Sequence, residues 1–221
     1  MKNRLCLVMA NSIPSSSSTP SGSIPPREGR LAESLPSETE KSQFTITELD
    51  RTKSENLLQI ADKIKMIAKN VKFVIGEDEI GRRITTGKDS WGQERQFILA
   101  HHTVDSASDV CGYLEYYEKG DAPYVAFIGV INAYDKEKKI PGVGTALMLR
   151  FVEHSREIGK EVIILECRET KEGKDYRLPQ FYEKVAQRAN CGFEKERVGY
   201  YRNGDPMLEI TYLLKQDYQT T

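Results

Sequence analysis

The sequence predicts an α/β (α+β) domain with a mixed, mainly antiparallel central sheet, one βαβ crossover and flanking helices. Three observations lead to this prediction. Consecutive strand-like runs in the middle of the chain are joined by connectors too short for a parallel crossover. The last of these runs is followed by a glycine turn, a helical segment and a continuously apolar strand, which is the order of a βαβ unit. Two further strand-like runs flank an Asn-Gly pair, a strong hairpin signal.

The first predicted elements are a strand and a helix. Residues 44–50 (FTITELD) alternate in character, which is typical of a strand with one buried face. The segment 51–70 places apolar residues three and four apart on one helical face, at Leu57, Ile60, Ile64, Ile67 and Ala68. The stretch from Gly76 to Gln93 is rich in glycine and charge. We therefore expect a long exposed connection there, which helps to form the wall of a binding site.

The central runs are 95–104, 109–118 and 122–132, separated by the polar segments DSAS and KGD. Such connectors predict antiparallel hairpins. After the third run, a helix is expected from about Gly142 to Ile158, followed by a buried strand in EVIILEC (161–167). The start of this helix would lie at the mouth of the preceding strand, where ligands bind in such sheets.

The C-terminal part predicts one more helix and a hairpin. The helix covers 178–190, with Pro179 near its first turn. Two strands, 191–204 and 206–214, are expected to pair around the tight turn at Asn203-Gly204. The sequence thus supplies strands on both sides of the predicted crossover.

Composition places all of these elements in one domain. The chain has 221 residues and is 38% hydrophobic, which suits one substantial core. Residues 1–42 are dominated by serine, proline and charge, and we expect a disordered Ser/Pro-rich tail before a folded domain at 43–221. A net charge of -1 gives no global field to recruit nucleic acid or an anionic membrane, so neither partner is expected.

Cysteine and histidine usage gives no sign of a metal site or a disulfide framework. The four cysteines lie far apart without a CxxC pair, and the three histidines have no metal-ligand spacing. Reduced, buried thiols fit a cytoplasmic protein. We expect no metal and a monomer or homodimer.

The turn KIPGVG (139–144) is the segment most suggestive of ligand binding. The backbone amides of Val143, Gly144 and Thr145 would be the unpaired N–H groups of a helix N-terminus, which attract anions, and glycine allows a phosphate to come close. The turn lacks the Lys-Ser/Thr pair of a P-loop and the third glycine of a dinucleotide fingerprint. From the residues alone, a phosphate seat and a plain loop-to-helix junction both remain open.

The order of these parts resembles the GCN5-related N-acetyltransferase (GNAT) family. Its signature, Gln/Arg-x-x-Gly-x-Gly/Ala between a strand and the following helix, is similar to Lys139-Ile-Pro-Gly142-Val-Gly144, with lysine in first place. The segment QFYEKVAQRANCGFEKE (180–196) is similar to the family's FYEKLGF segment, with several additional residues. The resemblance covers about residues 43–215 and is strongest over 109–194.

The resemblance implies an acetyl-CoA-dependent N-acetyltransferase in which a primary amine attacks the thioester directly. It implies that acetyl-CoA lies in a splay between the strands at 122–132 and 161–167. The pantetheine arm would pair near Val130 and Ile131, and the residues expected to hold the pyrophosphate or its charge are Lys139, Gly142, Val143, Gly144 and Thr145.

Two catalytic roles also follow from the resemblance. Tyr182 matches the family tyrosine that protonates the leaving thiolate. Glu166 is the preferred general base, with Glu115 and Tyr124 as alternatives. The acceptor amine, a small molecule or a protein, is not identified, and a non-catalytic acyl-CoA-binding sensor or interaction module is the alternative function. A phosphate-binding protein unrelated to CoA is a third reading.

Overall fold

The computed structural model describes residues 44–53, 56–70, 76–102, 109–131, 140–168, 177–201 and 204–215. The predicted tail, Lys139 and Asn203 lie outside the described residues. The elements are β1 (Phe44–Glu48), α1 (Leu57–Asn70), α2 (Glu77–Thr86), β2 (Gln96–His102), β3 (Val110–Lys119), β4 (Ala122–Val130), α3 (Val143–Glu157), β5 (Val162–Arg168), α4 (Arg177–Arg188), β6 (Gly192–Tyr200) and β7 (Pro206–Leu213).

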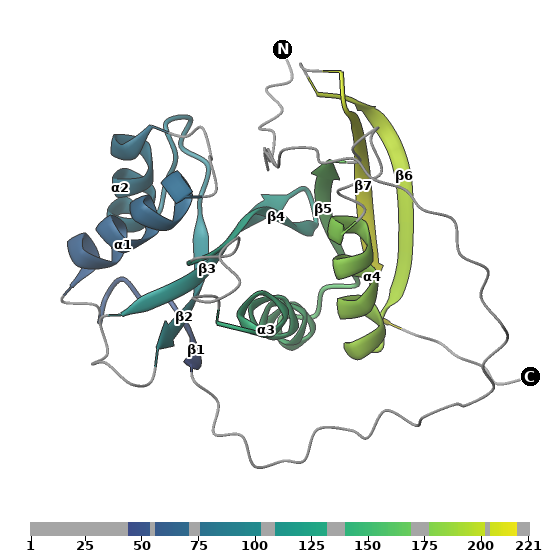
Figure 1. The fold of residues 1–221 in the computed structure, drawn as a ribbon, viewed down its shortest axis with the longest axis horizontal. Helices are drawn as coiled ribbons and strands as arrows, with labels where there is room; N and C mark the ends of the chain where they lie inside the picture. Colours follow the sequence, from purple (N-terminus) through teal and green to yellow (C-terminus); the bar gives the residue numbers. More distant parts are fainter. Residues whose placement is uncertain are drawn as a thin grey trace, which may run out of the picture.

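The strands form one mixed sheet in the order β1-β2-β3-β4-β5-β7-β6 (Figure 1). All neighbouring pairs are antiparallel except β4 and β5, which are parallel and are connected through α3. The predicted fold class is therefore confirmed, including the hairpins of β2, β3 and β4 and the single crossover. The β6–β7 hairpin is also confirmed, and Gly204 in its turn has φ +83°.

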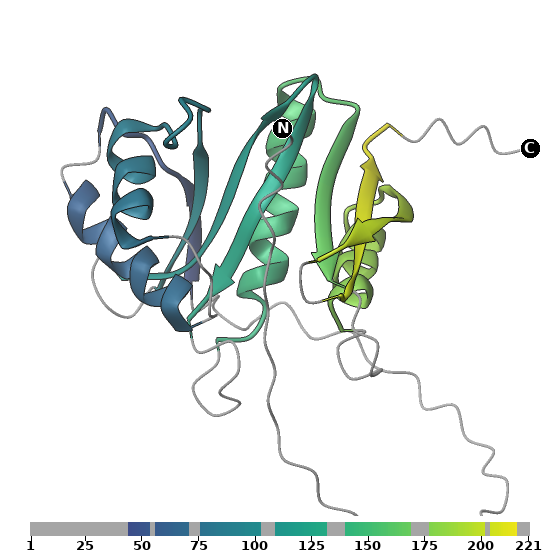
Figure 2. The same cartoon turned by 90° about the horizontal axis from the view of Figure 1, so that it is seen from above.

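Helices cover opposite faces of the sheet and create two clusters of buried side chains (Figures 1 and 2). On one face, Ile64 and Ile67 of α1 and Ile84 of α2 pack against β2, β3 and β4. On the other, α3 and α4 bury Leu147, Phe151, Val185 and their neighbours against the sheet. The apolar stripe predicted for α1 lies on its buried side.

The prediction of a long exposed connection at 76–93 is wrong, because this stretch contains α2. Ile80 and Ile84 lie one turn apart and are buried, so they give the helix an apolar contact face. Three acidic residues occupy the first turn of α2, where their charge interacts favourably with the helix dipole. Gly87 ends the helix in the left-handed conformation, with φ +76°. Arg83, which is buried, lies on the same face of α2. Its charge makes this part of the sequence look like an exposed segment.

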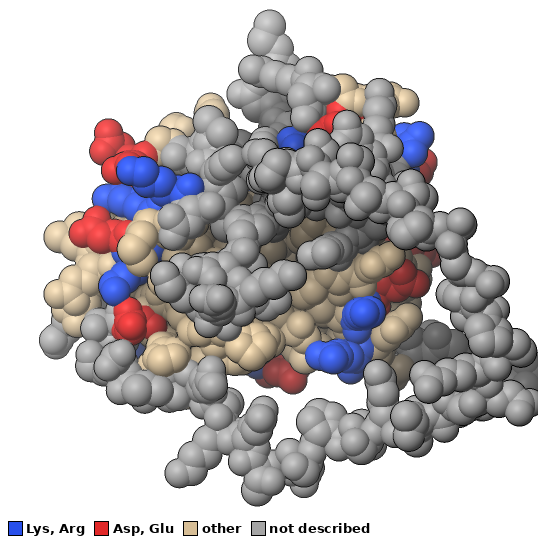
Figure 3. Space-filling view, in the orientation of Figure 1, with Lys and Arg blue, Asp and Glu red and all other residues tan. Residues whose placement is uncertain are grey.

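Charge is evenly mixed on the visible surface. In the orientation of Figure 3, acidic and basic side chains lie next to one another along the edges of the described residues. Among those residues, no helix is both long and apolar enough to cross a membrane.

Candidate functional site

The two parallel strands pair over a very short distance. β4 and β5 are in register only at Tyr124 with Ile164 and at Val125 with Leu165. Beyond these residues, the C-terminal parts of β4 and β5 do not pair with each other in the described chain. On its other edge, β4 continues to pair with β3 as far as Val130. Backbone hydrogen-bonding groups on the facing edge of β4 are thus left for another partner, as in strand addition.

The glycine turn stands at the end of this open edge. Gly142 adopts φ +83° and ψ -17°, a left-handed conformation that favours glycine, and it supplies no side-chain cap to α3. The first intrahelical bond is donated by the Ala146 amide to the Gly142 carbonyl, 2.9 Å away. The amides of Val143, Gly144 and Thr145 therefore lack an acceptor inside the helix and are suited to an anion.

Gly144 lies where three predicted parts of the site meet. A Cβ built on Gly144 would lie 3.6 Å from the ring of Phe181 in α4 and 3.8 Å from a methyl group of Val130 in β4. The turn, the end of β4 and the Phe-Tyr pair are thus brought together by the fold. Phe181, the first residue of the Phe-Tyr pair, therefore contacts the glycine turn, and the motif alone does not predict this contact.

Val130 and Ile131, the two residues expected near the pantetheine arm, differ in their backbone bonding. The Ile131 amide donates to the Cys111 carbonyl at 2.8 Å, so it points toward β3. Successive residues in an antiparallel strand direct their N–H and C=O groups to opposite sides. The backbone groups of Val130 consequently face the open edge of β4, whereas the Ile131 amide is occupied.

Tyr182 belongs to α4, and its side chain lies deep in the core cluster that also contains Cys167 of β5. Its side chain is only 1% exposed and its ring packs edge-on against Phe181, with centroids 5.0 Å apart. Burial, with smaller contributions from Cys167 and Tyr201, raises the pKa of the Tyr182 phenol above its ordinary value. The phenol is therefore protonated at neutral pH, as a proton donor must be.

Glu166 and Tyr124 form a polar pair on the opposite face of the sheet. Cys167 contributes to the core beneath α4, so its neighbour Glu166 points to the other face. Burial and the nearby Glu166 carboxylate, which accepts a hydrogen bond from the phenol, raise the pKa of Tyr124. Tyr124 therefore stays protonated near neutral pH. Glu166 is the acceptor of this pair, and Tyr182 flanks β5 from the other side.

Glu115, one of the two alternative bases, is held in a buried ion-pair cluster. Its Oε1 lies 2.7 Å from Nη1 of Arg83 and 3.6 Å from Nη1 of Arg95. Burial raises the pKa of Glu115, and the two guanidinium groups oppose that rise. The carboxylate thus holds α2 and the start of β2 on β3. Residue spacing does not reveal this cluster, because Arg83 and Glu115 lie 32 positions apart along the chain.

Three possible metal ligands also come together, although the sequence predicted no metal. Ligand atoms of Glu48, His154 and Glu157 lie within 4.8 Å of one another. Arg150 is already among them, with one guanidinium nitrogen 2.6 Å from Glu48 and another 2.9 Å from Glu157. Arg150 thus pairs with both carboxylates, and the cluster is an ion-pair network.

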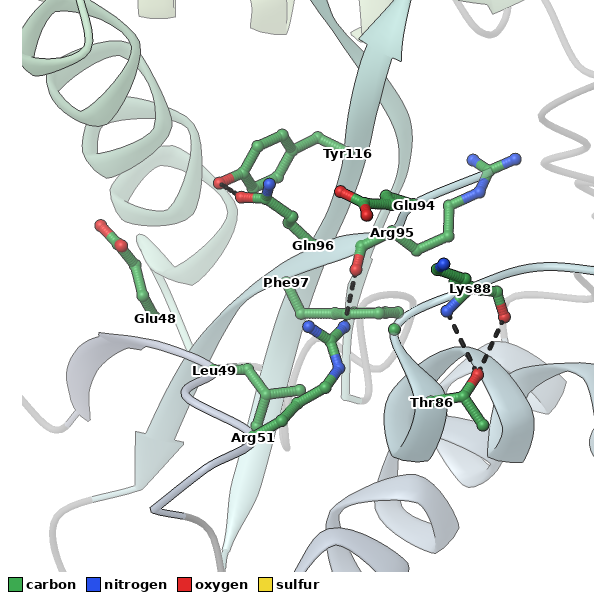
Figure 4. A pocket seen from close by; sticks show the side chains of 11 residues that line it. Glu48, Leu49, Arg51, Thr86, Lys88, Glu94, Arg95, Gln96, Phe97 and Tyr116 are labelled. Atoms are coloured by element: carbon green, nitrogen blue, oxygen red, sulfur yellow. Dashed lines mark hydrogen bonds between the residues drawn. The ribbon is translucent and has the colours of Figure 1, made fainter. Parts of the chain in front are cut away.

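Two hollows lie near the turn between α2 and β2. The first, of about 300 Å³, is shown in Figure 4 and extends from Glu48 to Thr86. Arg51 lies at its base and donates to the carbonyls of Ile84 at 2.9 Å and Arg95 at 2.6 Å, so it acts as a backbone clamp. The second, of about 440 Å³, is lined by Trp91, Gly92, Gln93, Glu94, Gln96, Tyr117 and Glu118.

Comparison with known proteins identifies this architecture. No family model and no curated protein matches the sequence. Among solved structures, a protein assigned to the GNAT acetyltransferase family from Desulfovibrio desulfuricans matches with a TM-score of 0.54 at 17% identity, over 78% of this chain and 99% of its own. The ribosomal-protein-S18-alanine N-acetyltransferase of Escherichia coli matches with a TM-score of 0.52 at 14% identity, over 80% and 98%.

An aminoglycoside 6'-N-acetyltransferase in complex with coenzyme A gives a TM-score of 0.53 at 15% identity, over 78% of this chain and 98% of its own. Each of these proteins is matched over nearly its whole length. The chain therefore has the GNAT fold, and the predicted resemblance is confirmed at the level of the fold.

Proposed function

We propose that this protein is an acetyl-CoA-dependent N-acetyltransferase that transfers an acetyl group to a primary amine of a small molecule or a protein. The observation that carries the proposal is the open edge of β4, which ends at the unpaired amides of α3. This arrangement offers strand-like bonding groups for an amide-containing arm and a positive helix end for the attached phosphates.

In this proposal the pyrophosphate binds the amides of Val143, Gly144 and Thr145, and Gly142 allows the sharp turn that presents them. Lys139 adds a positive charge from outside the described residues. The pantetheine arm pairs with the backbone of Val130, and the occupied amide of Ile131 restricts that residue to side-chain contact. Acetyl-CoA is the acyl-donor cosubstrate, and no metal takes part.

The chemistry uses groups on both faces of the sheet. A proton leaves the ammonium substrate for Glu166, directly or through water, and the neutral nitrogen attacks the thioester carbon. When the tetrahedral intermediate collapses, the C–S bond breaks and the thiolate takes a proton from Tyr182. The attached nitrogen loses its second proton in the same step, and this proton restores the Tyr182 phenol directly or through water. Tyr124 orients Glu166 through their hydrogen bond. The products are an acetylated amine and free CoA.

The similar structures support this reaction class and leave the acceptor open. One of them is a ribosomal-protein-alanine N-acetyltransferase, and another is an aminoglycoside N-acetyltransferase in complex with coenzyme A. The same fold thus serves protein and small-molecule amines, and fold does not choose between them. For this chain we propose an amine acceptor, no nucleic-acid or membrane partner, a cytoplasmic location and a monomer or homodimer.

Thermal shift with acetyl-CoA, longer acyl-CoAs and ATP tests the proposal, because a ligand that binds only the folded state raises the midpoint of unfolding. We expect stabilisation by acetyl-CoA and little by ATP. Thiol release with a panel of amines then separates an enzyme from a non-catalytic acyl-CoA-binding module, which would bind without turnover. Stabilisation by ATP or simple phosphate alone would remove the acetyltransferase proposal.

A further inference from the structure

The turn between α2 and β2 holds an exposed tryptophan in a fixed position. The Asp89 carboxylate accepts hydrogen bonds from the amides of Trp91 and Gln93, both at 2.9 Å, and it pairs with Arg95 at 2.7 Å. Asp89 and Arg95 are themselves buried. The Trp91 side chain nevertheless remains 63% exposed. An ordered backbone thus presents a large aromatic ring to solvent, which is typical of a binding surface.

The hollow of about 440 Å³ beside Trp91 has the chemistry of a cation site. Two aromatic side chains, Trp91 and Tyr117, and two acidic ones, Glu94 and Glu118, line it together with Gln93 and Gln96. Neither lysine nor arginine is among its lining residues in the described chain. Aromatic faces and carboxylates together favour ammonium or guanidinium groups.

Two basic groups near the hollow already contact residues that line it. Lys160 pairs with Glu118 at 2.9 Å, and Arg95 stacks on Tyr117 at 4.2 Å while paired with Asp89. Glu94 has no ion pair within 4 Å among the described residues. In Figure 4 its carboxylate is directed toward Gln96 and Tyr116, whereas the Arg95 guanidinium extends away from it. Glu94 lines both hollows, and its charge acts on Arg51 in the first, so a ligand cation in the second hollow would share this carboxylate with Arg51.

A chain of side-chain contacts connects the hollow with Glu166, the proposed general base. Tyr117 in its wall packs against Tyr124, with ring centroids 5.0 Å apart, and Tyr124 is hydrogen-bonded to Glu166. Tyr117 and Tyr124 are opposite one another in the β3–β4 register and share a face of the sheet. The hollow and Glu166 thus lie on the same face of the sheet, two side-chain contacts apart.

The path also carries a repulsion between like charges. Glu166 lies directly opposite Glu209 in the β5–β7 register, and Glu209 lies opposite Glu196 in β6. Like charges at directly opposite positions destabilise a sheet. Lys119 lies 4.0 Å from Glu209 and offsets part of this repulsion. A cationic ligand on this face would relieve the repulsion.

We propose that the hollow between Trp91 and Tyr117 is a subsite for a second positive charge of the acceptor, so that the preferred substrates are amines with at least two cationic groups. This inference rests on the proposed acetyltransfer function for its catalytic meaning. Binding of a cation in the hollow, however, can be measured without turnover. The substrate class follows from the aromatic and acidic lining and from the position of Glu166.

Intrinsic fluorescence gives a direct test, because Trp91 is the single tryptophan of the chain. The full chain is titrated with 1,4-diaminobutane and with butylamine, which has the same carbon length and one charge. We expect a saturable change in Trp91 emission and half-saturation at an at least about fivefold lower concentration for the diamine, since one added ion pair contributes roughly 1 kcal/mol. Equal half-saturation by the two amines, or no change with either, overturns the proposal.

Variants localise the effect. Glu94→Gln should raise the half-saturation concentration of the diamine about threefold or more, whereas Glu153→Gln, on the exposed side of α3, should leave it unchanged. With acetyl-CoA present, Trp91→Ala should lower kcat/KM for the diamine more than for butylamine. An unchanged Glu94→Gln titration would overturn the assignment. If acetyl-CoA fails to bind while the diamine titration succeeds, the catalytic proposal fails and the cation site stands.

Discussion

Gly112 of β3 lies directly beneath Val143, the first residue of α3. A Cβ built on Gly112 would lie 2.7 Å from Cγ1 of Val143 and 3.3 Å from Cδ1 of Leu147. Val143 is completely buried, so it cannot move outward without losing its place in the core. This close approach of α3 to β3 sets the distance between the glycine turn and the sheet. It therefore also sets the position of the free amides at the start of α3.

Gly112→Ala should therefore displace the first turn of α3 and weaken acetyl-CoA binding. Overpacking of this kind costs about 1–3 kcal/mol, which is measurable by chemical denaturation. Acetyl-CoA affinity should fall in the same variant, as measured by calorimetry. Gly81→Ala is the matched control, because a Cβ there meets only the end of the Lys65 side chain at 3.6 Å. Equal stabilities of the two variants would contradict the proposed packing role.

The stability of the domain should depend strongly on keeping both Arg83 and Glu115. Arg83→Met leaves Glu115 buried with only the more distant Arg95, and removing one member of a buried pair costs about 3–5 kcal/mol. The double variant Arg83→Met/Glu115→Met should recover part of the loss, as measured by urea denaturation. Lys53→Met, which removes an exposed pair, should change stability little. A double variant as unstable as the sum of the singles would argue against coupling.

The same cluster explains which parts of the structure the sequence could predict. The order from β4 through α3 to β5 follows from local periodicity and connector length, so these elements were predictable. The helix α2 was missed because its buried face contains Arg83, whose partner Glu115 lies 32 positions away. A charged residue on a buried face looks like surface until its partner is known.

The site, like the fold, has parts that follow from local sequence and parts that depend on contacts between distant residues. The anion seat is local, since one turn supplies its amides. The pairing of Tyr124 with Glu166 depends on how β4 and β5 are aligned, and the hollow at Trp91 depends on the contact between a turn and β3. Neither register nor tertiary contact is encoded in residue spacing alone. The sequence therefore indicated the cosubstrate, while the proposed acceptor surface required the structure.

Asp89 predicts acid sensitivity of the Trp91 turn. Burial alone would raise the pKa of Asp89, but Arg95 and the amides of Gln93 and Trp91 outweigh it and lower the pKa below the ordinary value of 3.8. A lowered carboxyl pKa gives stability that is present above the unfolded-state value and is lost as pH falls through the folded-state value. Stability should thus decline below about pH 3.8.

The measurement is the free energy of unfolding as a function of pH for the wild type and Asp89→Asn. The variant should be less stable above pH 3.8, and the difference should narrow as the pH is lowered further, because a protonated aspartate has lost the same charge. Trp91 emission reports on the turn in both proteins. A constant difference across the whole pH range would show that Asp89 acts only through its shape.

Tyr182→Phe should lower kcat for acetyl transfer more than tenfold while acetyl-CoA affinity changes little, as expected when a positioned proton donor is removed. The ring is retained, so packing against Phe181 is preserved. Tyr200→Phe serves as the control, because that side chain is 62% exposed. Turnover by Tyr182→Phe at the wild-type rate would remove Tyr182 from the mechanism and leave it as a core residue.

The two glycines of the turn should respond differently to substitution. Gly142 has φ +83°, so Gly142→Ala should destabilise the domain by roughly 1 kcal/mol through backbone strain alone. Gly144 has ordinary helical geometry, and a Cβ there would make normal contacts with Phe181 and Val130, so Gly144→Ala should fold with nearly unchanged stability.

Gly144→Glu then tests the anion seat itself. A carboxylate placed beside the free amides would compete with the pyrophosphate and repel it, so acetyl-CoA affinity should fall at least about tenfold while the free energy of unfolding changes little. Gly144→Gln, of nearly the same size and without charge, separates repulsion from steric hindrance and should weaken binding less. If both variants bind acetyl-CoA as tightly as the wild type, the pyrophosphate does not rest on this turn, even though the turn has the geometry for it.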